Sequence, residues 1–124
     1  MSLRYLLIIL LFTGCTAGKM IETHLYFGQS RPNGSLISET EWNKFKENQI
    51  HQVFKESSTV ISVSGNWYDT AAHKLITEPS YVVVYYYKRS GDLSKKIDSL
   101  RENYKRQFDQ QSVLRVDKKV VASF

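Results

Sequence analysis

The 124-residue chain has one cysteine, two prolines and no densely basic or acidic stretch. A single cysteine excludes an internal disulfide, so the stability of the domain must come from packing. His24, His51 and His73 form no HxH or HExxH spacing, and no CxxC is present, which argues against a structural zinc site. Neither a GxSxG elbow nor a phosphate-binding glycine loop occurs. We therefore expect no metal and no cofactor, and the sequence favours a non-catalytic protein.

The residues that are abundant are apolar and aromatic. Hydrophobic residues make up 42% of the chain and aromatic residues 13%, including eight tyrosines. This composition is sufficient for one packed domain of ordinary size. The formal net charge of +5 is a modest excess, typical of a solubilising surface.

The N-terminal segment has the pattern of an export signal. Arg4 precedes an apolar run over residues 6–12, which is followed by Thr13, Gly14 and Cys15. The run is too short to span a bilayer, which requires about 20 apolar residues, and it fits a secretory signal. The segment also resembles the bacterial lipoprotein signal, which implies acylation of Cys15 and cleavage before it. The alternative is an ordinary secreted protein with an incidental cysteine.

This interpretation predicts the location of the protein and divides the chain into three parts. Residues 1–14 are the signal peptide, 15–21 the lipidated Cys15 and a tether, and 22–124 a single domain. Several acyl chains on Cys15 would anchor the protein to a membrane, at about 0.8 kcal/mol for each buried CH₂. We expect a periplasm-facing protein of the cell envelope. In a Gram-negative host that follows the enterobacterial sorting rule, Thr16 rather than Asp after the cysteine favours the outer membrane. Export argues against a nucleic-acid partner.

Hydrophobic periodicity in the mature chain predicts four strands and two helices. The strands are expected at residues 23–28, 59–68, 80–88 and 112–116, with residues 120–124 as a further extended segment. Ser38 and Glu41 have the spacing of a capping box at the start of the first helix. Asp92 or Ser94 is expected to cap the second. The helices carry apolar stripes at helical spacing, formed by Trp42, Phe45, Gln49, Ile50, Val53 and Phe54 and by Leu93, Ile97, Leu100, Tyr104 and Phe108.

The order strand, helix, strand, strand, helix, strand predicts an α+β fold, a ferredoxin-like βαββαβ sandwich. In this fold, both helices cover one face of a four-stranded antiparallel sheet, and the first and third strands are central. Alternation along the strands then assigns side chains to two faces. We expect Leu25, Phe27, Ile61, Val63, Val82, Val84, Leu114 and Val116 to face the helices. The opposite face would carry His24, Tyr26, Ser62, Ser64, Tyr81, Val83, Tyr85, Tyr87, Val113 and Arg115.

A tyrosine-rich face turned away from the helices would mark an interface or a ligand site. Its candidate contact residues are His24, Tyr26, Tyr81, Tyr85 and Tyr87. Three alternatives remain open at this point. The face packs on a second copy in a homodimer, it binds a small ligand or a glycan by tyrosine stacking, or the C-terminal segment of the same chain covers it. The expected partners of this domain are thus a second copy, an envelope protein or a glycan.

Several charged and aromatic residues are candidates for a ligand pocket. Planar guanidinium groups suit carboxylate or phosphate ligands, so Arg31 and Arg115 could form an anion site with Tyr104 and Lys105. The favoured alternative is structural: Arg31 or Arg115 pairs with Glu78 and holds a loop. Trp67 is expected as a core residue at the end of the sheet more than as a stacking platform. The ligand-binding candidates are therefore Arg31, Trp67, Glu78, Tyr104 and Arg115.

Five short motifs together carry a family resemblance: LYFGQSRPNG, ETEW, GNWYD, EPSYVVV and YKRQFDQQSVLRV. With these motifs in this order, the chain resembles the domain-of-unknown-function 3574 family of bacterial proteins over about residues 23–124. The resemblance implies one compact secreted or lipid-anchored domain and brings no reaction. The sequence departs from the family at His24, where an acidic residue is more common.

Three hypotheses about function remain, one of which is a structural role in which the domain only spaces or supports an envelope assembly. The first is an envelope lipoprotein with a non-catalytic binding or interaction domain. The alternative is a small cavity-type enzyme, similar to monooxygenases or isomerases of dimeric ferredoxin-like barrels. In that case His24, Tyr26 and Arg115 would line its site. This second hypothesis depends on analogy of fold, which is weak support for a reaction.

Overall fold

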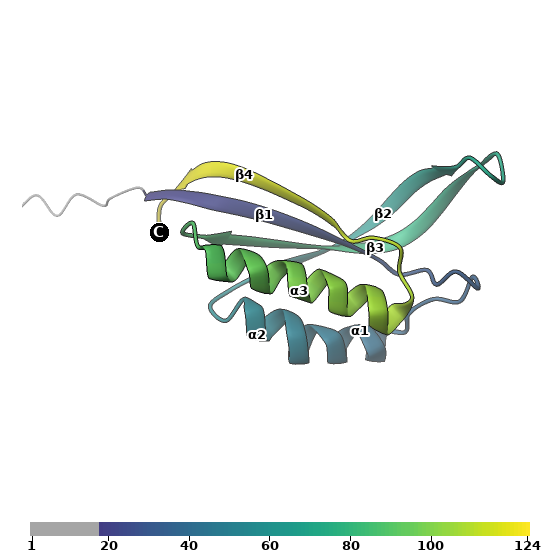
Figure 1. Ribbon diagram of the computed structural model, residues 1–124, viewed down its shortest axis with the longest axis horizontal. Helices are drawn as coiled ribbons and strands as arrows, with labels where there is room; N and C mark the ends of the chain where they lie inside the picture. The colour runs from purple at the N-terminus through teal and green to yellow at the C-terminus, as the bar shows by residue number, and fades with distance from the viewer. Residues whose placement is uncertain (1–17) are drawn as a thin grey trace, which may run out of the picture.

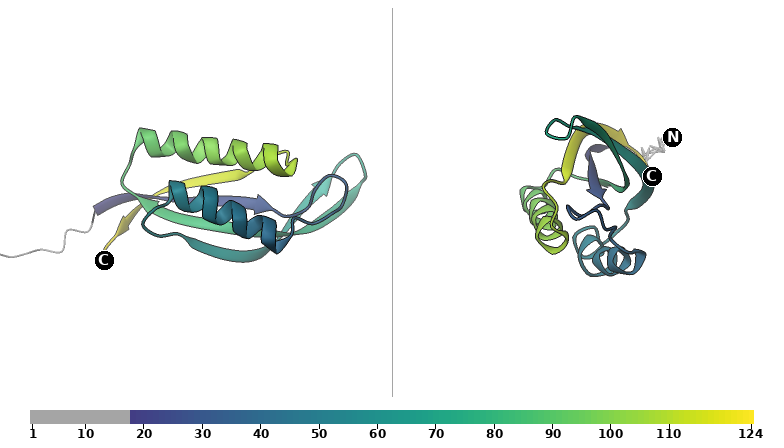
Figure 2. Two further views of the ribbon diagram at one scale, coloured as in Figure 1. Left: turned by 90° about the horizontal axis from the view of Figure 1, so that it is seen from below. Right: turned by 90° about the vertical axis from the view of Figure 1, so that its right-hand side faces the viewer.

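The computed structural model describes residues 18–124, so the predicted signal peptide and Cys15 lie outside the described residues. The chain forms a four-stranded antiparallel sheet in the order β2-β3-β1-β4. Figures 1 and 2 show the helices on one face of this twisted sheet. The predicted ferredoxin-like α+β sandwich is confirmed. Its elements are β1 (Gly18–Gly28), α1 (Glu39–Phe45), η1 (Lys46–Ile50), α2 (His51–Val53), β2 (Thr59–Asp69), β3 (Lys74–Tyr87), α3 (Gly91–Phe108) and β4 (Leu114–Ala122).

The helices begin at serine caps. At α1, the Ser38 hydroxyl accepts from the Glu41 N–H, and the Glu41 carboxylate accepts from the Ser38 N–H, so the predicted capping box is present. The helix continues through the π-helical segment η1 into α2. At α3 the cap is Ser90, whose hydroxyl accepts from the Leu93 N–H. The prediction of Asp92 or Ser94 as this cap is wrong, because the backbone is already extended at Ser90 and helical after it.

The outer strand β4 and the start of β1 are longer than the sequence pattern predicts. Gly18 pairs with Ala122 and Glu22 with Lys118, so residues 18–21, expected as a tether, belong to the sheet. The C-terminal segment extends the edge of the sheet as part of β4. It does not lie across a face, so this intramolecular covering of the open side is excluded.

The register of the central strands shows that part of the predicted assignment of side chains to the two sheet faces is reversed. Leu25 and Phe27 face the helices as expected, and they lie opposite Val83 and Tyr81 on β3. Because paired residues share a face, the tyrosines of β3 also turn toward the helices. Tyr85 and Tyr87 are only 8% and 7% exposed, and Tyr81 packs against the same core. The prediction that Tyr81, Tyr85 and Tyr87 lie on the open face is therefore wrong.

Aromatic residues of the first helix explain this choice. Trp42 stacks on Tyr81 with ring centroids 4.5 Å apart and planes 8° from parallel, and Phe54 stacks on Tyr85 at 4.2 Å. Both faces of β3 are apolar enough to form a core, so the alternation of side chains along this strand does not by itself determine which face turns toward the helices. Flat rings on the helix favour the tyrosine face, because aromatic pairs add about 0.5–1.5 kcal/mol beyond their buried area.

The same reversal holds for the outer strands. Arg115 lies opposite Leu25 and so on the helix side, whereas the predicted helix-facing residues of β2 and β4 lie on the open side. The aliphatic residues that point away from the helices, against prediction, are Ile61, Val63, Val82, Val84, Leu114 and Val116.

The core lies between the sheet and the helices and is centred on aromatic rings. Tyr104 contacts Phe27, Phe45 and Phe108 with centroid separations of 4.8, 5.0 and 4.8 Å. All buried core residues fall between Ile21 and Val113. We therefore expect residues 18–124 to fold without the segment that precedes them.

Candidate functional site

The sheet face away from the helices is aliphatic; its outer strands are exposed, whereas Val82 and Val84 on the central strand β3 are only 5% and 7% exposed. We call this face the open sheet face. Ile61, Leu114 and Val116 are 46%, 56% and 40% exposed there, and Tyr86 is 44% exposed. An extended exposed apolar surface on one face marks an interaction site more often than a plain solvent surface does. Its members are Tyr26, Ile61, Val63, Val82, Val84, Tyr86, Leu114 and Val116.

Charged groups lie at both ends of the open sheet face: Glu78 lies beside Gly28 at the end where the hairpin arm begins, and further charges lie at the other end. Glu22 is opposite Lys118 on the neighbouring strand, and its carboxylate also contacts Nε2 of the His24 ring. The centre of the face, around Tyr26 and Val82, carries no lysine, arginine, aspartate or glutamate, and His24 lies beside Tyr26 with ring centroids 6.4 Å apart. His24 and Tyr26 are thus the two predicted interface residues that the structure does place on this face.

A two-stranded arm extends beyond the sheet. Pairing of β3 with β1 ends at Gly28 and Ser80, but pairing of β3 with β2 continues to Asp69 and Lys74. We call residues 65–78 the hairpin arm, and Figure 1 shows it leaving the body of the domain. Trp67 is 49% exposed on this arm. The expectation that Trp67 is a core residue is wrong, because the strands that carry it have no helix beneath them.

Arg31 holds a loop against the helices. Its guanidinium donates to the Glu41 carboxylate at 2.7 Å and to the Leu36 carbonyl at 2.9 Å, and it lies 5.8 Å from the centre of the Phe108 ring. The predicted loop-holding role agrees with these contacts, but the partner is Glu41 and not Glu78. The loop itself turns at Gly34, whose φ of 84° favours glycine.

Glu78 and Tyr104 fix the end of β1. The Glu78 carboxylate accepts from the Ser30 N–H at 3.2 Å, and a Cβ at Gly28 would come within 3.0 Å of it. The Tyr104 hydroxyl donates to the Gly28 carbonyl at 2.8 Å. Desolvation in the core raises the pKa of Tyr104, so this phenol stays protonated and keeps donating.

Arg115 is held by carboxylates at the other end of α3. Its guanidinium donates to Asp98 at 3.0 Å, to Asp117 at 3.0 Å and to the Ser94 hydroxyl at 3.0 Å. Partial burial lowers the pKa of Arg115, but the hydrogen bonds to Asp117 and Asp98 outweigh this effect and raise it. The group is therefore a satisfied structural cation.

These positions rule out two of the predicted sites, the shared anion pocket and the enzyme cavity. Arg115 contacts Ser94 while Arg31 lies over Phe108, and about 14 helical residues at 1.5 Å each separate these contacts by about 21 Å. Arg31 and Arg115 therefore do not share an anion pocket. Nor do His24, Tyr26 and Arg115 line one cavity, because Arg115 lies on the helix side of the sheet and the other two on the open side.

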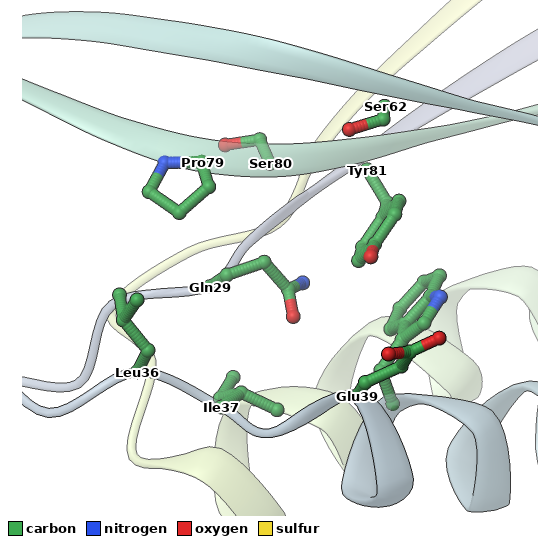
Figure 3. A pocket seen from close by; sticks show the side chains of 9 residues that line it. Gln29, Leu36, Ile37, Glu39, Ser62, Pro79, Ser80 and Tyr81 are labelled. Atoms are coloured by element: carbon green, nitrogen blue, oxygen red, sulfur yellow. The ribbon is translucent and has the colours of Figure 1, made fainter.

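A pocket of about 140 Å³ lies where the 29–37 loop, the start of α1 and β3 meet (Figure 3). No sequence pattern signals this pocket, because its main polar group is a lone glutamine in a loop. Gln29 is 4% exposed, and its amide nitrogen donates to the Phe27 carbonyl at 3.0 Å and to the Tyr104 hydroxyl at 2.9 Å. Within residues 18–124, its carbonyl oxygen Oε1 has no hydrogen-bond partner.

Two further observations bear on the kind of site. In the described part of the chain, no three histidine, cysteine, aspartate or glutamate residues lie close enough to hold a metal ion. The helices between residues 18 and 124 are also not long and apolar enough to cross a membrane.

Comparison of the sequence with protein families gives one decisive result. The profile of a family described as protein of unknown function, DUF3574, matches residues 22–124. The chain belongs to the DUF3574 family. This confirms the resemblance seen in the motifs, and it assigns no reaction. A search of curated proteins finds no match for this DUF3574 chain.

Solved structures share the fold of this DUF3574 domain at low sequence identity. A phage SAM lyase in complex with S-methyl-5′-thioadenosine has a TM-score of 0.63 and 14% identity, covering 90% of this chain and 96% of the lyase. CutA from Synechococcus elongatus has a TM-score of 0.53 and 9% identity, covering 87% and 81%. The GlnK–ATP complex of B. subtilis has 0.50 and 14%, covering 85% and 84%. At these identities, the likeness concerns the fold alone.

Proposed function

We propose that the protein is a lipid-anchored envelope protein whose domain associates with further copies of itself through the open sheet face and acts as a non-catalytic binding module. The observation that carries this proposal is the exposed aliphatic surface around Ile61, Leu114 and Val116. With the tyrosines of β3 in the core, this face offers few rings for stacking on a sugar. Flat aliphatic surfaces instead favour another protein surface, whose burial contributes about 25 cal/mol for each Å².

A second copy is the occupant that best fits the charges. The centre of the face carries no lysine, arginine, aspartate or glutamate; one end holds Glu22 beside Lys118, and the other end holds Glu78. Two copies can therefore approach with apolar centres in contact and without like charges directly opposed. A face whose charged residues were mainly of one sign would have required a partner of the opposite charge.

The hairpin arm supports the same arrangement. Trp67, Tyr68 and Leu75 are 49%, 56% and 63% exposed, and Trp67 and Tyr68 lie on opposite faces of the arm because they are adjacent in a strand. A two-stranded hairpin with apolar side chains on both faces is only marginally stable in water alone. Contact with a neighbouring copy would remove these side chains from water and order the arm.

The location of the protein rests on the N-terminal sequence. Cys15 after Thr13 and Gly14 is the proposed attachment point, with β1 beginning three residues later at Gly18. A chain expressed in a lipoprotein-processing bacterium should incorporate labelled palmitate, and Cys15→Ser should abolish the label. Retention of the label in Cys15→Ser would disprove acylation at this residue.

Self-association in the envelope can be tested by cross-linking in cells. A photo-reactive amino acid at position 114, in place of the exposed Leu114, should yield a covalent product of two copies. The same replacement at Val121 is the matched control, because this residue is 72% exposed on the opposite face of the same strand. Equal cross-linking from both positions, or none from either, would refute the assignment of the open sheet face.

A small enzyme is the second candidate, and the fold shared with a phage SAM lyase is the observation that favours it. This candidate predicts that the chain converts SAM to S-methyl-5′-thioadenosine. Incubation of the purified protein with SAM, followed by chromatography of the products, separates the two proposals. Turnover above that of a heat-denatured sample would favour the enzyme, and we expect none.

A further inference from the structure

Four basic side chains gather at the end of the domain where β1 begins. Lys19 is the second residue of β1, and Lys119 lies on β4. Lys88 and Arg89 follow the last residue of β3. Strand pairing brings these segments together, because Ile21 is opposite both Lys119 and the last residue of β3. Figure 1 shows the start of β1, the start of α3 and the C-terminus at this end, and the hairpin arm at the other. We call Lys19, Lys88, Arg89 and Lys119 the basic end.

The basic end carries the excess positive charge of the domain. Residues 18–124 contain 16 of the 17 lysines and arginines and all 12 aspartates and glutamates, so without these four residues the two kinds of charge are equal in number. All four side chains are exposed, and within the described residues none of them forms a hydrogen bond or an ion pair. The side-chain carboxylates near this end are those of Glu22, Asp92 and Asp117. Because Glu22 contacts His24 and Asp117 accepts from Arg115, the end keeps an excess of positive charge.

A groove of about 420 Å³ lies between the start of α3 and the strands β1 and β4. Arg89 and Lys119 both line this groove. Arg115 lines it as well, but its guanidinium is already bonded to Asp117, the only carboxylate among the lining residues. Lys118 borders the groove too, but its side chain belongs to the open sheet face. The positive charge that is free to meet a ligand at the groove therefore comes from Arg89 and Lys119, and the volume is sufficient for a phosphate group.

The strand ends beside this groove have one face that is both basic and apolar. Lys19 is opposite Val121, and Lys119 lies two residues before Val121, so the three side chains share the helix side of the sheet. Figure 2 shows the ends of β1 and β4 extending past the start of α3. Val121 is accordingly 72% exposed. An exposed apolar side chain flanked by cations suits the boundary between lipid headgroups and acyl chains.

The same end is close to the proposed lipid anchor. Cys15 is three residues before Gly18, where β1 begins, and a chain spans at most about 3.6 Å per residue. The strand therefore begins within about 11 Å of the acylated residue. The Debye length is about 8 Å at physiological ionic strength, so the field of anionic lipids extends to this part of the domain.

We propose that the basic end docks on the phosphates of an anionic phospholipid membrane, with Arg89 and Lys119 on a headgroup at the groove and Val121 at the boundary of the acyl chains. Guanidinium and ammonium groups are suitable partners for phosphate. The orientation rests on the proposed anchor at Cys15, but the attraction to the lipid does not. Each cation at an anionic leaflet should strengthen binding about fivefold, so the basic end should contribute about 600-fold.

The test uses residues 18–124, which contain the buried core and lack Cys15. Sedimentation with vesicles of equal parts phosphatidylglycerol and phosphatidylcholine measures the bound fraction. We expect half-maximal binding at about 1 mM accessible lipid, and no binding to vesicles of phosphatidylcholine alone. Raising the salt from about 0.1 M to about 1 M should release the domain, because the Debye length falls from about 10 Å to about 3 Å. The palmitate label tests the anchor separately, so failure of the anchor and failure of the docking surface give different results.

Two double variants separate the basic end from net charge. Arg89→Gln with Lys119→Gln should weaken binding to the mixed vesicles about 25-fold. Lys44→Gln with Lys74→Gln removes the same charge from α1 and from the start of β3 at the tip of the hairpin arm, and should change binding less than about twofold. All four replaced side chains are exposed and unpaired within the described residues, so both variants should keep the urea midpoint of the wild type.

Absence of binding to the mixed vesicles up to about 10 mM lipid, ten times the expected value, would overturn the proposal. Equal binding to phosphatidylcholine vesicles would also overturn it, because their surface has no net charge. Equal weakening by the two double variants would assign the attraction to the net charge of the domain and contradict docking through the basic end.

Discussion

Replacing Tyr104 by phenylalanine removes one hydroxyl from the centre of the core and keeps the aromatic ring. Tyr104 is fully buried, and its hydroxyl donates to the Gly28 carbonyl and accepts from the Gln29 amide. Gln29 keeps its second bond, to the Phe27 carbonyl, so the Gly28 carbonyl suffers the larger loss. A hydrogen bond contributes about 1 kcal/mol net, and a buried group that loses its partner adds a similar cost, so we expect about 2 kcal/mol of destabilisation.

Urea unfolding at one fixed protein concentration measures this change, because the stability of a self-associating chain depends on concentration. With a slope of about 1–2 kcal/mol per molar urea, the midpoint of Tyr104→Phe should fall by about 1–2 M. Tyr68→Phe is the control: this tyrosine is 56% exposed on the hairpin arm and should change the free energy of unfolding by less than about 0.5 kcal/mol. Equal midpoints for Tyr104→Phe and the wild type would refute the reasoning that this hydroxyl ties α3 to the end of β1.

Three further predictions concern stability. Ser38→Ala should cost about 1 kcal/mol in urea unfolding through loss of the capping box; no change would show that the cap is dispensable. Phe27→Ala should cost about 3–5 kcal/mol, seen as a large fall in the melting temperature, because Phe27 is fully buried. Partial burial raises the pKa of Asp98, but hydrogen bonds from Arg101 and Arg115 outweigh it, so the pKa lies below 3.8. A carboxyl group whose pKa is lowered by folding stabilises the folded state at pH values above its ordinary pKa. This stabilisation is lost as the pH falls through the lowered pKa. Asp98→Asn should therefore flatten the loss of stability between about pH 5 and pH 3, and an unchanged slope would contradict this pair of contacts.

The sequence was sufficient to predict the order of elements, because periodicity and capping are local signals. The Ser38 and Glu41 spacing placed the first helix, and the apolar stripe through Ile97 and Tyr104 placed the second. The start of β1 and the length of β4 were underestimated. Residues 18–21 and 117–119 are polar or mixed, and they form strand because residues 18–21 pair with residues 119–122 and residues 117–119 pair with residues 21–23.

The local sequence pattern could not predict which face of the sheet the side chains of β3 occupy. The run from Tyr81 to Tyr87 is apolar on both faces, so either face could have formed the core. The decision depends on Trp42 and Phe54, which lie far away in sequence and stack on Tyr81 and Tyr85. As a result, the aromatic residues expected on the surface lie in the core, and an aliphatic surface takes their place.

The candidate sites show the same limit. Arg31, Glu78, Tyr104 and Arg115 were singled out by residue type, and all four form internal contacts that fix the fold. Gln29 was not singled out, because a lone glutamine in a loop resembles ordinary surface. Its distinctive property is the side-chain oxygen Oε1, an acceptor without a donor. This property arises only in the folded structure, where the amide nitrogen donates to the Phe27 carbonyl and the Tyr104 hydroxyl.

The most direct test of self-association through the open sheet face is the molar mass of residues 18–124 in solution, measured by light scattering over a range of concentrations. The wild-type domain should form a multimer, and Val116→Glu should convert it to a monomer, because burying a charged carboxylate in an apolar interface is costly. Val121→Glu, on the opposite face of the same strand, should keep the wild-type mass. A wild-type domain that stays monomeric at every concentration, or a Val116→Glu variant that associates as the wild type does, would contradict self-association through this face.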